Sequence, residues 1–217
     1  MFSKIAPRYD LLNRIMSLGR DLSWRRLAIE QAAFPENSLI LDLGAGTADM
    51  ALEVLRANSN SKVIGYDNCS DLIDIGREKV DGTVKWTIGD GRELPFRSEM
   101  FDGVVAGFSV RNIPELDIVF DEIYRILKPG GKIAILDMVK PRGKFFGKVF
   151  RFHFIHIVPL LGKLIGSDPD AYSYLLPSIE NFYTSEELHQ KIEEIGCKNV
   201  RSKELMLKTV SLCIGSK

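Results

Sequence analysis

The segment from Leu39 to Asp49 reads LILDLGAGTAD, and it constrains the fold more than any other part of the chain. A short apolar run ends at Asp42, and a turn with Gly44 and Gly46 follows before a segment of helical character. Glycine is needed where the backbone turns tightly and lets a ligand approach the main chain. This order predicts a β-strand, a ligand-binding loop and an α-helix, the unit from which nucleotide-binding α/β domains are built.

The residues of the loop indicate which ligand it would hold. A dinucleotide-binding loop has glycines at its first, third and sixth positions. Gly44 and Gly46 occupy the first two, but Asp49 stands at the sixth. Because a carboxylate there would repel a pyrophosphate, the loop favours a ligand with a cationic amine and a sulfonium, such as S-adenosylmethionine (SAM). A plain turn after a strand is the simpler alternative.

Apolar runs and helical segments alternate along the chain from residue 38 to residue 139. This alternation predicts a parallel sheet with helices on both faces. Two strand-like runs near the C-terminus are separated by only a few residues, which implies an antiparallel hairpin. The predicted fold class is α/β, with a Rossmann-like, mostly parallel sheet of seven strands closed by that hairpin. We predict strands at 39–42, 62–66, 84–88, 101–106, 132–137, 199–205 and 209–214, and helices near 49–57, 71–79 and 115–127.

Two helix starts carry capping signals. Ser70 stands directly before the second predicted helix, where its hydroxyl would accept a hydrogen bond from a backbone amide. Thr184 and Glu187 have the spacing of a capping box, which predicts a further helix that ends at Gly196.

Two more acids stand at the ends of predicted strands. Asp67 ends the second strand, where a carboxylate would accept hydrogen bonds from ribose hydroxyls. Asp90 follows the third strand, where it would meet an adenine amino group. Ligands of open α/β sheets lie beyond the carboxyl ends of the strands, so both positions suit a nucleoside. The alternatives are a helix-capping aspartate at Asp67 and an ordinary Gly-Asp-Gly turn at Asp90.

Composition excludes several classes of protein. The chain has 217 residues, and 29 lysines and arginines balance 29 aspartates and glutamates, so no excess of basic charge points to nucleic acid. Its three cysteines are widely spaced, which fits a reducing compartment and predicts neither a disulfide framework nor a metal site. We find no signal peptide and no uncharged run of about 18 residues, which predicts a cytoplasmic location.

Four motifs carry a family resemblance: IAPRYDLLN at 5–13, FDGVVAGFSVRN at 101–112, YRILKPGG at 124–131 and YSYLLPSI at 172–179. Together they resemble the ubiquinone/menaquinone biosynthesis C-methyltransferases, the demethylmenaquinone methyltransferase family of class I SAM-dependent enzymes. The resemblance runs from about residue 2 to the C-terminus. It implies one domain over 1–217, with an N-terminal helical cap over 1–35 and a lid or substrate insertion over 140–182. It also implies methyl transfer from SAM to a ring carbon of a reduced, prenylated quinone, without a metal.

The resemblance also implies which residues form the site. The predicted SAM-binding residues include those of the glycine loop and those at SAM-contacting positions of the family. They are Asp42, Gly44, Gly46, Thr47, Asp49, Asp67, Asp90, Gly91 and Gly107. Candidates on the quinol side are Tyr9, Arg111, Asn112, His153, His156, Tyr172 and Tyr174.

Several of these side chains have a second interpretation. Arg111 would bind a developing phenolate or, equally, form a structural ion pair. Tyr9 would close over the cofactor or pack the N-terminal helix. A histidine such as His153 would serve as the general base, or merely lie among the aromatic residues of its segment. The sequence does not assign the base.

The sequence departs from the family pattern at a few positions. Ala48 stands where a third glycine is usual, Gly91 replaces a common alanine and Gly107 replaces a common serine. A usual glycine-rich stretch before the last strand contains Lys208 and Thr209, which do not adopt glycine backbone angles cheaply. These changes leave SAM binding as the expectation, but they leave two alternatives for the acceptor: the prenylated quinol of the family, or another prenylated or phenolic molecule.

The stretch 140–163 combines lysines and arginines with phenylalanines, and no acid occurs between Asp137 and Asp168. Such a surface would lie on an anionic membrane leaflet, where a prenylated quinol resides, or would form an active-site lid. The sequence leaves open whether two copies of the chain form a homodimer. Three other functions also stay open: a methyltransferase for another small molecule, an NAD-dependent oxidoreductase, which Asp49 and the hairpin disfavour, and a non-catalytic SAM-binding module.

Overall fold

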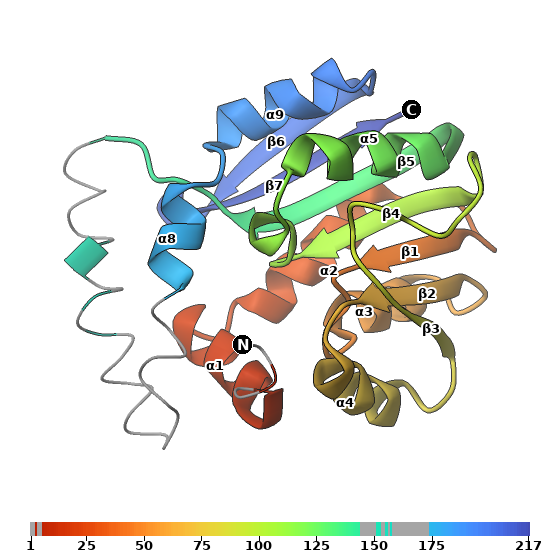
Figure 1. Cartoon of the computed structure of the whole chain (residues 1–217), viewed down its shortest axis with the longest axis horizontal. Coiled ribbons are helices and arrows are strands. Elements are labelled where there is room, and N and C mark those ends of the chain that lie inside the picture. The colour runs from red at the N-terminus through yellow and green to blue at the C-terminus, as the bar shows by residue number, and fades with distance from the viewer. Residues whose placement is uncertain (1–2, 4–5, 144–150, 153–154, 156, 158–173) are drawn as a thin grey trace.

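The computed structural model describes Ser3 and residues 6–143, 151–152, 155, 157 and 174–217. Within this part of the chain, one seven-stranded sheet has the order β3-β2-β1-β4-β5-β7-β6 (Figure 1). The first five strands run parallel, and β7 pairs antiparallel with both β5 and β6. The predicted mostly parallel sheet with a terminal antiparallel hairpin is therefore confirmed. The strands are β1 (Leu39–Leu43), β2 (Lys62–Asp67), β3 (Val84–Ile88), β4 (Phe101–Gly107), β5 (Leu127–Met138), β6 (Lys198–Leu205) and β7 (Val210–Ser216).

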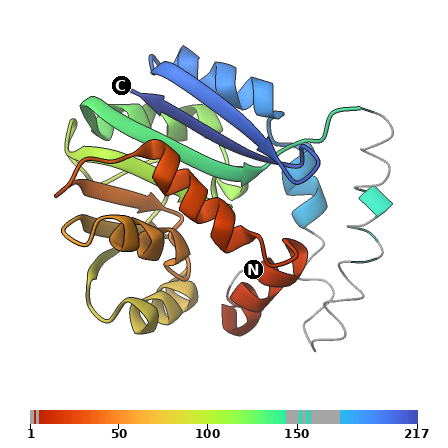
Figure 2. The same ribbon diagram turned by 180° about the vertical axis from the view of Figure 1, so that it is seen from behind.

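Helices cover both faces of the sheet (Figures 1 and 2). One face carries α2 and α3, and the opposite face carries α5 and α9. Among the described residues, every helix is too short or too polar to cross a bilayer. The described helices are η2 (Ala6–Arg8), α1 (Tyr9–Met16), α2 (Asp21–Ala32), α3 (Asp49–Ala57), α4 (Ser70–Val80), η3 (Val110–Asn112), α5 (Leu116–Ile126), α8 (Leu175–Glu180) and α9 (Ser185–Glu194).

The core consists of two apolar layers, one on each face of the sheet. Consecutive residues of a strand point to opposite faces, so Val104 packs in the layer under α5 and Val105 in the layer under α2. Both valines are fully buried. A parallel sheet that is covered on both faces needs such unbroken apolar strands. For this reason the alternation of strand and helix segments could be recognised in the sequence.

The capping signals had different outcomes. The capping box is confirmed, because Thr184 Oγ1 accepts from the Glu187 amide at 3.2 Å and the Thr184 amide donates to Glu187 Oε2 at 2.7 Å. The prediction for Ser70 is wrong, since α4 already includes Ser70 and its preceding residue is Cys69. The Cys69 amide instead donates to Asp67 Oδ1 at 2.9 Å, so an acid at the end of β2 takes part of the capping role.

The boundaries of α9 and β5 differ from those predicted. Helix α9 ends at Glu194, two residues before Gly196, whose φ of +101° turns the chain away from the helix. Strand β5 begins at Leu127, because the KPGG turn is accommodated as an irregularity in the pairing with β4. Most of the predicted insertion over 140–182 lies outside the described residues.

Candidate active site

A cavity opens at the carboxyl ends of the parallel strands, beside the start of α1. Its lining comes from the residues at or just after the ends of β1, β2, β3 and β4, together with the first residue of α1 and one residue of α4. The topology places a ligand at this edge in open α/β sheets. The lining residues are Tyr9, Leu43, Gly44, Gly46, Tyr66, Asp67, Asn68, Leu72, Gly89, Gly91, Phe108, Ser109, Asn112 and Ile113.

The cavity brings together six of the predicted site residues: Tyr9, Gly44, Gly46, Asp67, Gly91 and Asn112. Sequence reasoning missed the neighbours Tyr66, Asn68, Phe108 and Ser109, although each stands within one or two residues of a strand end. Their position close to the end of a predicted strand is the sequence feature that could have identified them. The remaining predicted residues, among those described, lie behind or beside the cavity lining.

The glycine loop reaches the cavity through two residues with positive φ. Gly44 has φ +69° and Gly46 φ +49°, and the Gly44 amide donates to the Tyr66 carbonyl at 2.7 Å. A Cβ on Gly44 would lie 2.2 Å from Cβ of Ser109, which donates through Oγ to the Leu43 carbonyl at 2.7 Å. The loop after β1 and the loop after β4 are thus packed so closely that only glycine fits at Gly44.

Asp67 joins the glycine loop to the end of β2. Its Oδ2 accepts from the Gly46 amide at 2.8 Å, and its Oδ1 accepts from the Cys69 amide at 2.9 Å. Burial raises the pKa of the Asp67 carboxyl, whereas these two amides lower it. Since a carboxylate offers about four acceptor positions, Asp67 keeps acceptor capacity on the cavity side.

Asp42 lies beneath the glycine loop and does not line the cavity. Its side chain is fully buried, Oδ2 accepts from the Ala51 amide at 3.0 Å, and Oδ1 has no hydrogen-bond partner. Burial raises the pKa of Asp42 to about 7, although Arg25 lowers it. The carboxyl therefore anchors the start of α3 and, at neutral pH, is divided between its neutral and charged forms.

We expect an Asp42→Asn substitution to flatten the dependence of stability on pH. The folded protein keeps the Asp42 proton over a range in which the unfolded chain has lost it, so stability falls as pH rises from about 4 to about 7. Between about pH 5 and pH 8, the free energy of unfolding of the parent should fall, and that of the variant should fall by about 1–3 kcal/mol less. Urea unfolding at both pH values measures this difference, and parallel losses in the two proteins would contradict it.

Asp49 is surrounded by cations of the protein. Its carboxylate lies 3.0 Å from Arg14 Nη2, 3.2 Å from Lys79 Nζ and 3.8 Å from Arg25 Nε. Burial would raise the pKa of Asp49, but Arg25, Lys79 and Arg14 outweigh it and lower the pKa. Because these three cations already balance its charge and it does not line the cavity, its geometry favours a role in anchoring the glycine loop over direct ligand contact.

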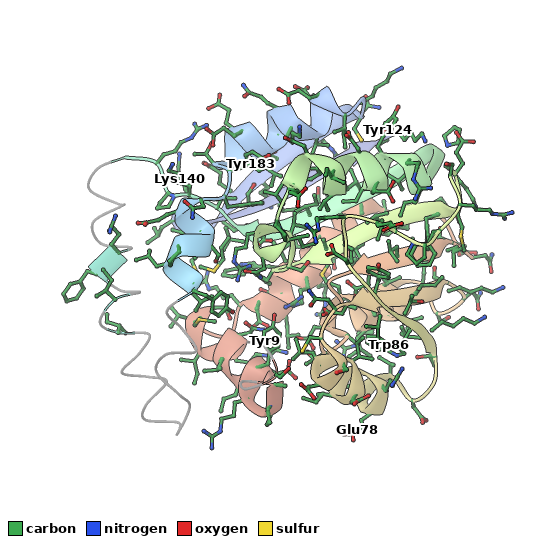
Figure 3. The ribbon with its side chains drawn as sticks, viewed as in Figure 1. Tyr9, Glu78, Trp86, Tyr124, Lys140 and Tyr183 are labelled. Atoms are coloured by element: carbon green, nitrogen blue, oxygen red, sulfur yellow. The ribbon has the colours of Figure 1, made fainter. Side chains whose placement is uncertain are left out.

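The same cluster fastens α1 to the loop. Thr47 Oγ1 donates to Asp10 Oδ1 at 2.6 Å, and Lys79 forms an ion pair with Asp10. Thr47 is therefore buried under α1 and is not part of the cavity lining. Through this contact α1 is held in place, with Tyr9 at its start facing the cavity (Figure 3).

Two further SAM candidates also lie away from the lining. The Asp90 side chain is 48% exposed and accepts from Arg92 Nη2 at 2.6 Å; these hydrogen bonds hold the pKa of Asp90 below its usual value. Gly107 packs against Arg25, because a Cβ there would lie 2.5 Å from Arg25 Nη1. Gly91 does line the cavity, against Ile113.

Arg111 forms a buried ion pair with Asp137. The exposed fractions of the two side chains are 5% and 0%, the Arg111 amide donates to Asp137 Oδ2 at 3.2 Å, and Nη1 donates to the Phe108 carbonyl at 2.8 Å. Burial would lower the pKa of Arg111, but Asp137 raises it. The structural interpretation of Arg111 is thus realised, and its Nε, buried with no hydrogen-bond partner, stays available to a ligand.

Tyr9 and Asn112 both line the cavity. Burial raises the pKa of the Tyr9 hydroxyl, although Arg25 and Arg111 lower it. Asn112 Oδ1 is buried without a hydrogen-bond partner. Tyr174 packs beside α8 near Leu12 and Leu175. The candidates His153, His156 and Tyr172 lie outside the described residues.

Solved structures with this fold include several methyltransferases. A SAM-dependent methyltransferase from Aquifex aeolicus superposes with a TM-score of 0.64 at 17% identity, covering 94% of this chain and 97% of that one. Phosphoethanolamine N-methyltransferase 2 from Haemonchus contortus, in complex with SAM, superposes with a TM-score of 0.62 at 20% identity, covering 83% and 38%. The fold is that of the class I methyltransferases.

Sequence comparison then identifies the family. The model of the ubiE/COQ5 methyltransferase family matches residues 1–217. A demethylmenaquinone methyltransferase from Thermus thermophilus is 37% identical over the full length of both chains. A ubiquinone/menaquinone biosynthesis C-methyltransferase from Geotalea daltonii is 34% identical over all of this chain and 94% of the relative. The chain belongs to the ubiE/COQ5 methyltransferase family, as the four sequence motifs predicted.

Proposed function

We propose that the protein transfers a methyl group from SAM to a ring carbon of a reduced, prenylated quinone precursor of menaquinone or ubiquinone. The full-length similarity to enzymes named for this reaction carries the proposal. The cavity at the carboxyl ends of β1–β4 provides the site. Transfer of a labelled methyl group to a reduced quinol tests it.

The cavity lining fits SAM at three places. Asp67 has spare acceptor capacity for a ribose diol, next to the glycine loop. Gly44 and Gly46 present backbone without side chains. Asn112 Oδ1 is a buried acceptor without a partner, which suits the amino group of the ligand. When bound, SAM supplies an electrophilic methyl group on its sulfonium.

The chain's own contribution is alignment and charge stabilisation. A quinol carbon becomes nucleophilic when a neighbouring hydroxyl loses its proton, and a buried cation favours the resulting oxyanion. Arg111 keeps one unpaired N–H for this task while Asp137 holds the guanidinium in position. Holding the carbon close to the methyl group and in line with it should lower much of the barrier. The general base is not assigned among the described residues, and His153 stays a prediction.

Substitution of Asp67 by alanine should weaken SAM binding by about 1–3 kcal/mol, because the ribose hydroxyls lose their acceptor. It also frees the Gly46 amide, which Asp67 holds at 2.8 Å. Isothermal calorimetry with SAM measures the loss. Asp74, a 67% exposed residue of the neighbouring helix α4, offers a control, and Asp74→Ala should bind SAM like the parent. Equal affinities of both variants would remove Asp67 from the site.

Membrane contact through 140–163 stays a prediction from composition, because most of that stretch lies outside the described residues. We propose that the protein is cytoplasmic and binds the inner membrane surface peripherally through this stretch. Sedimentation with anionic and with neutral vesicles tests the contact. The sequence also allows a homodimer, and sedimentation velocity in solution tests whether one forms.

A further inference from the structure

The chain between β3 and β4, residues 89–100, contains neither helix nor strand. Two of its residues, Gly89 and Gly91, line the candidate SAM cavity. Irregular backbone carries polar groups that no sheet or helix pairs, so side chains commonly fix such a segment. The side chains that fix it here come from β2 and from the last turns of α5, and the proposed reaction has used none of them.

The order of the strands indicates which part of a bound nucleoside reaches this segment. In the sheet order β3-β2-β1, the glycine loop follows β1, and Asp67, the proposed ribose acceptor, ends β2. The loop after β3 is the next along the same edge of the sheet, where ligands of open α/β sheets lie. With the ribose at Asp67, the base therefore lies at the loop that contains Gly89 and Gly91.

Tyr66 joins the glycine loop to this segment. Its carbonyl accepts from the Gly44 amide at 2.7 Å and from the Ala45 amide at 3.1 Å. Its hydroxyl donates to the Asp90 carbonyl at 2.9 Å, and the residue is only 2% exposed. One residue of β2 thus bonds both the loop after β1 and the loop after β3, and it sets the spacing between them.

The contact between Tyr66 and the segment is closely packed. A Cβ on Gly89 would lie 2.1 Å from the Tyr66 hydroxyl oxygen and 2.8 Å from Cζ, so the ring would have to move for any other residue to fit. The Gly89 amide donates to the Asp67 carbonyl at 3.1 Å, which fixes the start of the segment. Burial and the carboxylates of Asp90 and Glu93 raise the pKa of the Tyr66 hydroxyl, which therefore stays a donor.

The later part of the segment is held by Glu122 and Arg125 of α5. Glu122 Oε2 accepts from the Leu94 amide at 2.9 Å. Arg125 donates from Nη2 to the Leu94 carbonyl at 3.0 Å and from Nη1 to the Phe96 carbonyl at 2.8 Å. The two side chains also bind each other, Arg125 Nη2 donating to Glu122 Oε2 at 2.8 Å. One ion pair of the helix thus fixes main-chain groups of both Leu94 and Phe96.

Phe96 connects this ion pair to Tyr66. The centre of its ring lies 5.8 Å from that of Tyr66 at an interplanar angle of 65°, and 5.0 Å from that of Phe101 at 83°. Aromatic pairs prefer this edge-to-face geometry. A displacement of the Phe96 backbone would therefore move the Tyr66 ring and, through its hydroxyl, the carbonyl of Asp90.

We infer that Tyr66 and Arg125 are positioning residues for the base of SAM, and that Tyr66 makes the site selective for adenine. The Asp90 carboxylate is bonded to Arg92 at the surface, so the loop reaches the cavity with its main chain. Tyr66 holds that main chain at a fixed distance from the glycine loop, and Arg125 holds the Tyr66 ring through Phe96. The inference rests on the proposed function.

Substitution of Tyr66 by phenylalanine tests the hydroxyl alone, because the ring and its packing remain. The ligand is S-adenosylhomocysteine, the demethylated form of SAM, and calorimetry measures its Kd. We expect Tyr66→Phe to raise this Kd about 3- to 10-fold, since the Asp90 carbonyl loses its donor. Tyr124 lies on α5 under Lys217, away from the cavity (Figure 3), and Tyr124→Phe should bind like the parent. Equal Kd values in the two variants would overturn the inference.

A ligand with a changed base separates base positioning from a general loosening of the fold. S-inosylhomocysteine carries an oxo group in place of the 6-amino group of adenine. The parent should bind it about tenfold or more weakly than S-adenosylhomocysteine, and Tyr66→Phe should reduce this ratio about threefold or more. A ratio that stays unchanged while both ligands bind more weakly would contradict a role of Tyr66 in base selection.

A double-mutant cycle tests the connection from α5. Arg125→Met should raise the Kd of S-adenosylhomocysteine about 3- to 10-fold and leave kcat at saturating SAM unchanged, because the reacting atoms lie at the other end of the ligand. Combined with Tyr66→Phe, the increase should be smaller than the product of the two single increases, since both act on one loop. Lys128→Met, which breaks the nearby ion pair with Asp102, should match the parent. Independent effects would contradict the connection through Phe96.

These binding measurements need no acceptor, so they distinguish failure of the inference from failure of the proposed function. Weaker and less selective binding in Tyr66→Phe, without methyl transfer to any quinol by the parent, would sink the proposed reaction alone. Methyl transfer by the parent with unaltered binding in Tyr66→Phe would sink the inference alone. Absence of S-adenosylhomocysteine binding by the parent would overturn both.

Discussion

Replacement of Asp137 by asparagine should lower the free energy of unfolding by about 3–5 kcal/mol, because it leaves the buried Arg111 guanidinium without a counter-charge. Asp137 is 0% exposed and accepts from both the Arg111 amide and the Met138 amide, the latter at 2.8 Å. The pair also shapes the turn that carries Phe108 and Asn112. Denaturant unfolding monitored by circular dichroism measures the change.

An exposed ion pair provides the control for this result. In the Arg77–Asp74 pair on α4, the side chains are 53% and 67% exposed, so Asp74→Asn should change stability by less than about 0.5 kcal/mol. The double variant Arg111→Met, Asp137→Leu should recover much of the stability, but not methyl transfer, because it removes both buried charges. Comparable losses from Asp137→Asn and Asp74→Asn would contradict the buried-pair account.

Replacement of Gly44 by alanine should cost about 2–4 kcal/mol of stability and weaken SAM binding about tenfold or more. The added Cβ would lie 2.2 Å from Cβ and 2.6 Å from Oγ of Ser109, and the loop must move away from the end of β4 to avoid it. Because this movement displaces the loop that we propose as the SAM cradle, affinity and stability should fall together. Calorimetry and thermal unfolding measure the two effects.

The steric and the conformational costs can be separated within this chain. Gly19 has φ +74°, close to the +69° of Gly44, but a Cβ there would meet nothing within 4 Å. Gly19→Ala should therefore show only the cost of positive φ, about 1 kcal/mol. Adding Ser109→Gly to Gly44→Ala removes the two clashing atoms, leaving the Ser109 Cα at 3.6 Å, and should restore part of the stability. Equal losses at Gly19 and Gly44 would refute the packing argument.

Much of the fold could be predicted because each signal is local. The apolar runs of β2 and β3 place both strands to within a residue, although β3 lies at the edge of the sheet and only Val84 of it is buried. The capping box of Thr184 and Glu187 is a contact across three residues, and it forms as predicted. The prediction for Ser70 failed because α4 begins at Ser70 itself, one residue earlier than predicted, and Asp67 accepts from the amide of Cys69, which precedes the helix.

The site was harder to predict because side-chain partners come from distant segments. Asp49 stands in the glycine loop's helix, but Arg14 and Lys79, which balance its charge, come from α1 and α4. Asp90 follows a strand as predicted, yet Arg92 holds its carboxylate at the surface. A sequence pattern gives the position of an acid along a strand; it does not give the cation that the fold brings to it.

The most direct test of the central proposal is methyl transfer itself. The protein would be incubated with methyl-labelled SAM and a reduced short-chain demethylmenaquinol, beside a demethylated benzoquinol, and the products analysed for the position of the label. We predict label on a ring carbon of at least one quinol, with the ratio between the two giving the preferred ring. Binding of SAM by calorimetry without transfer to either quinol would contradict the proposed reaction and leave only the methyltransferase family and its fold.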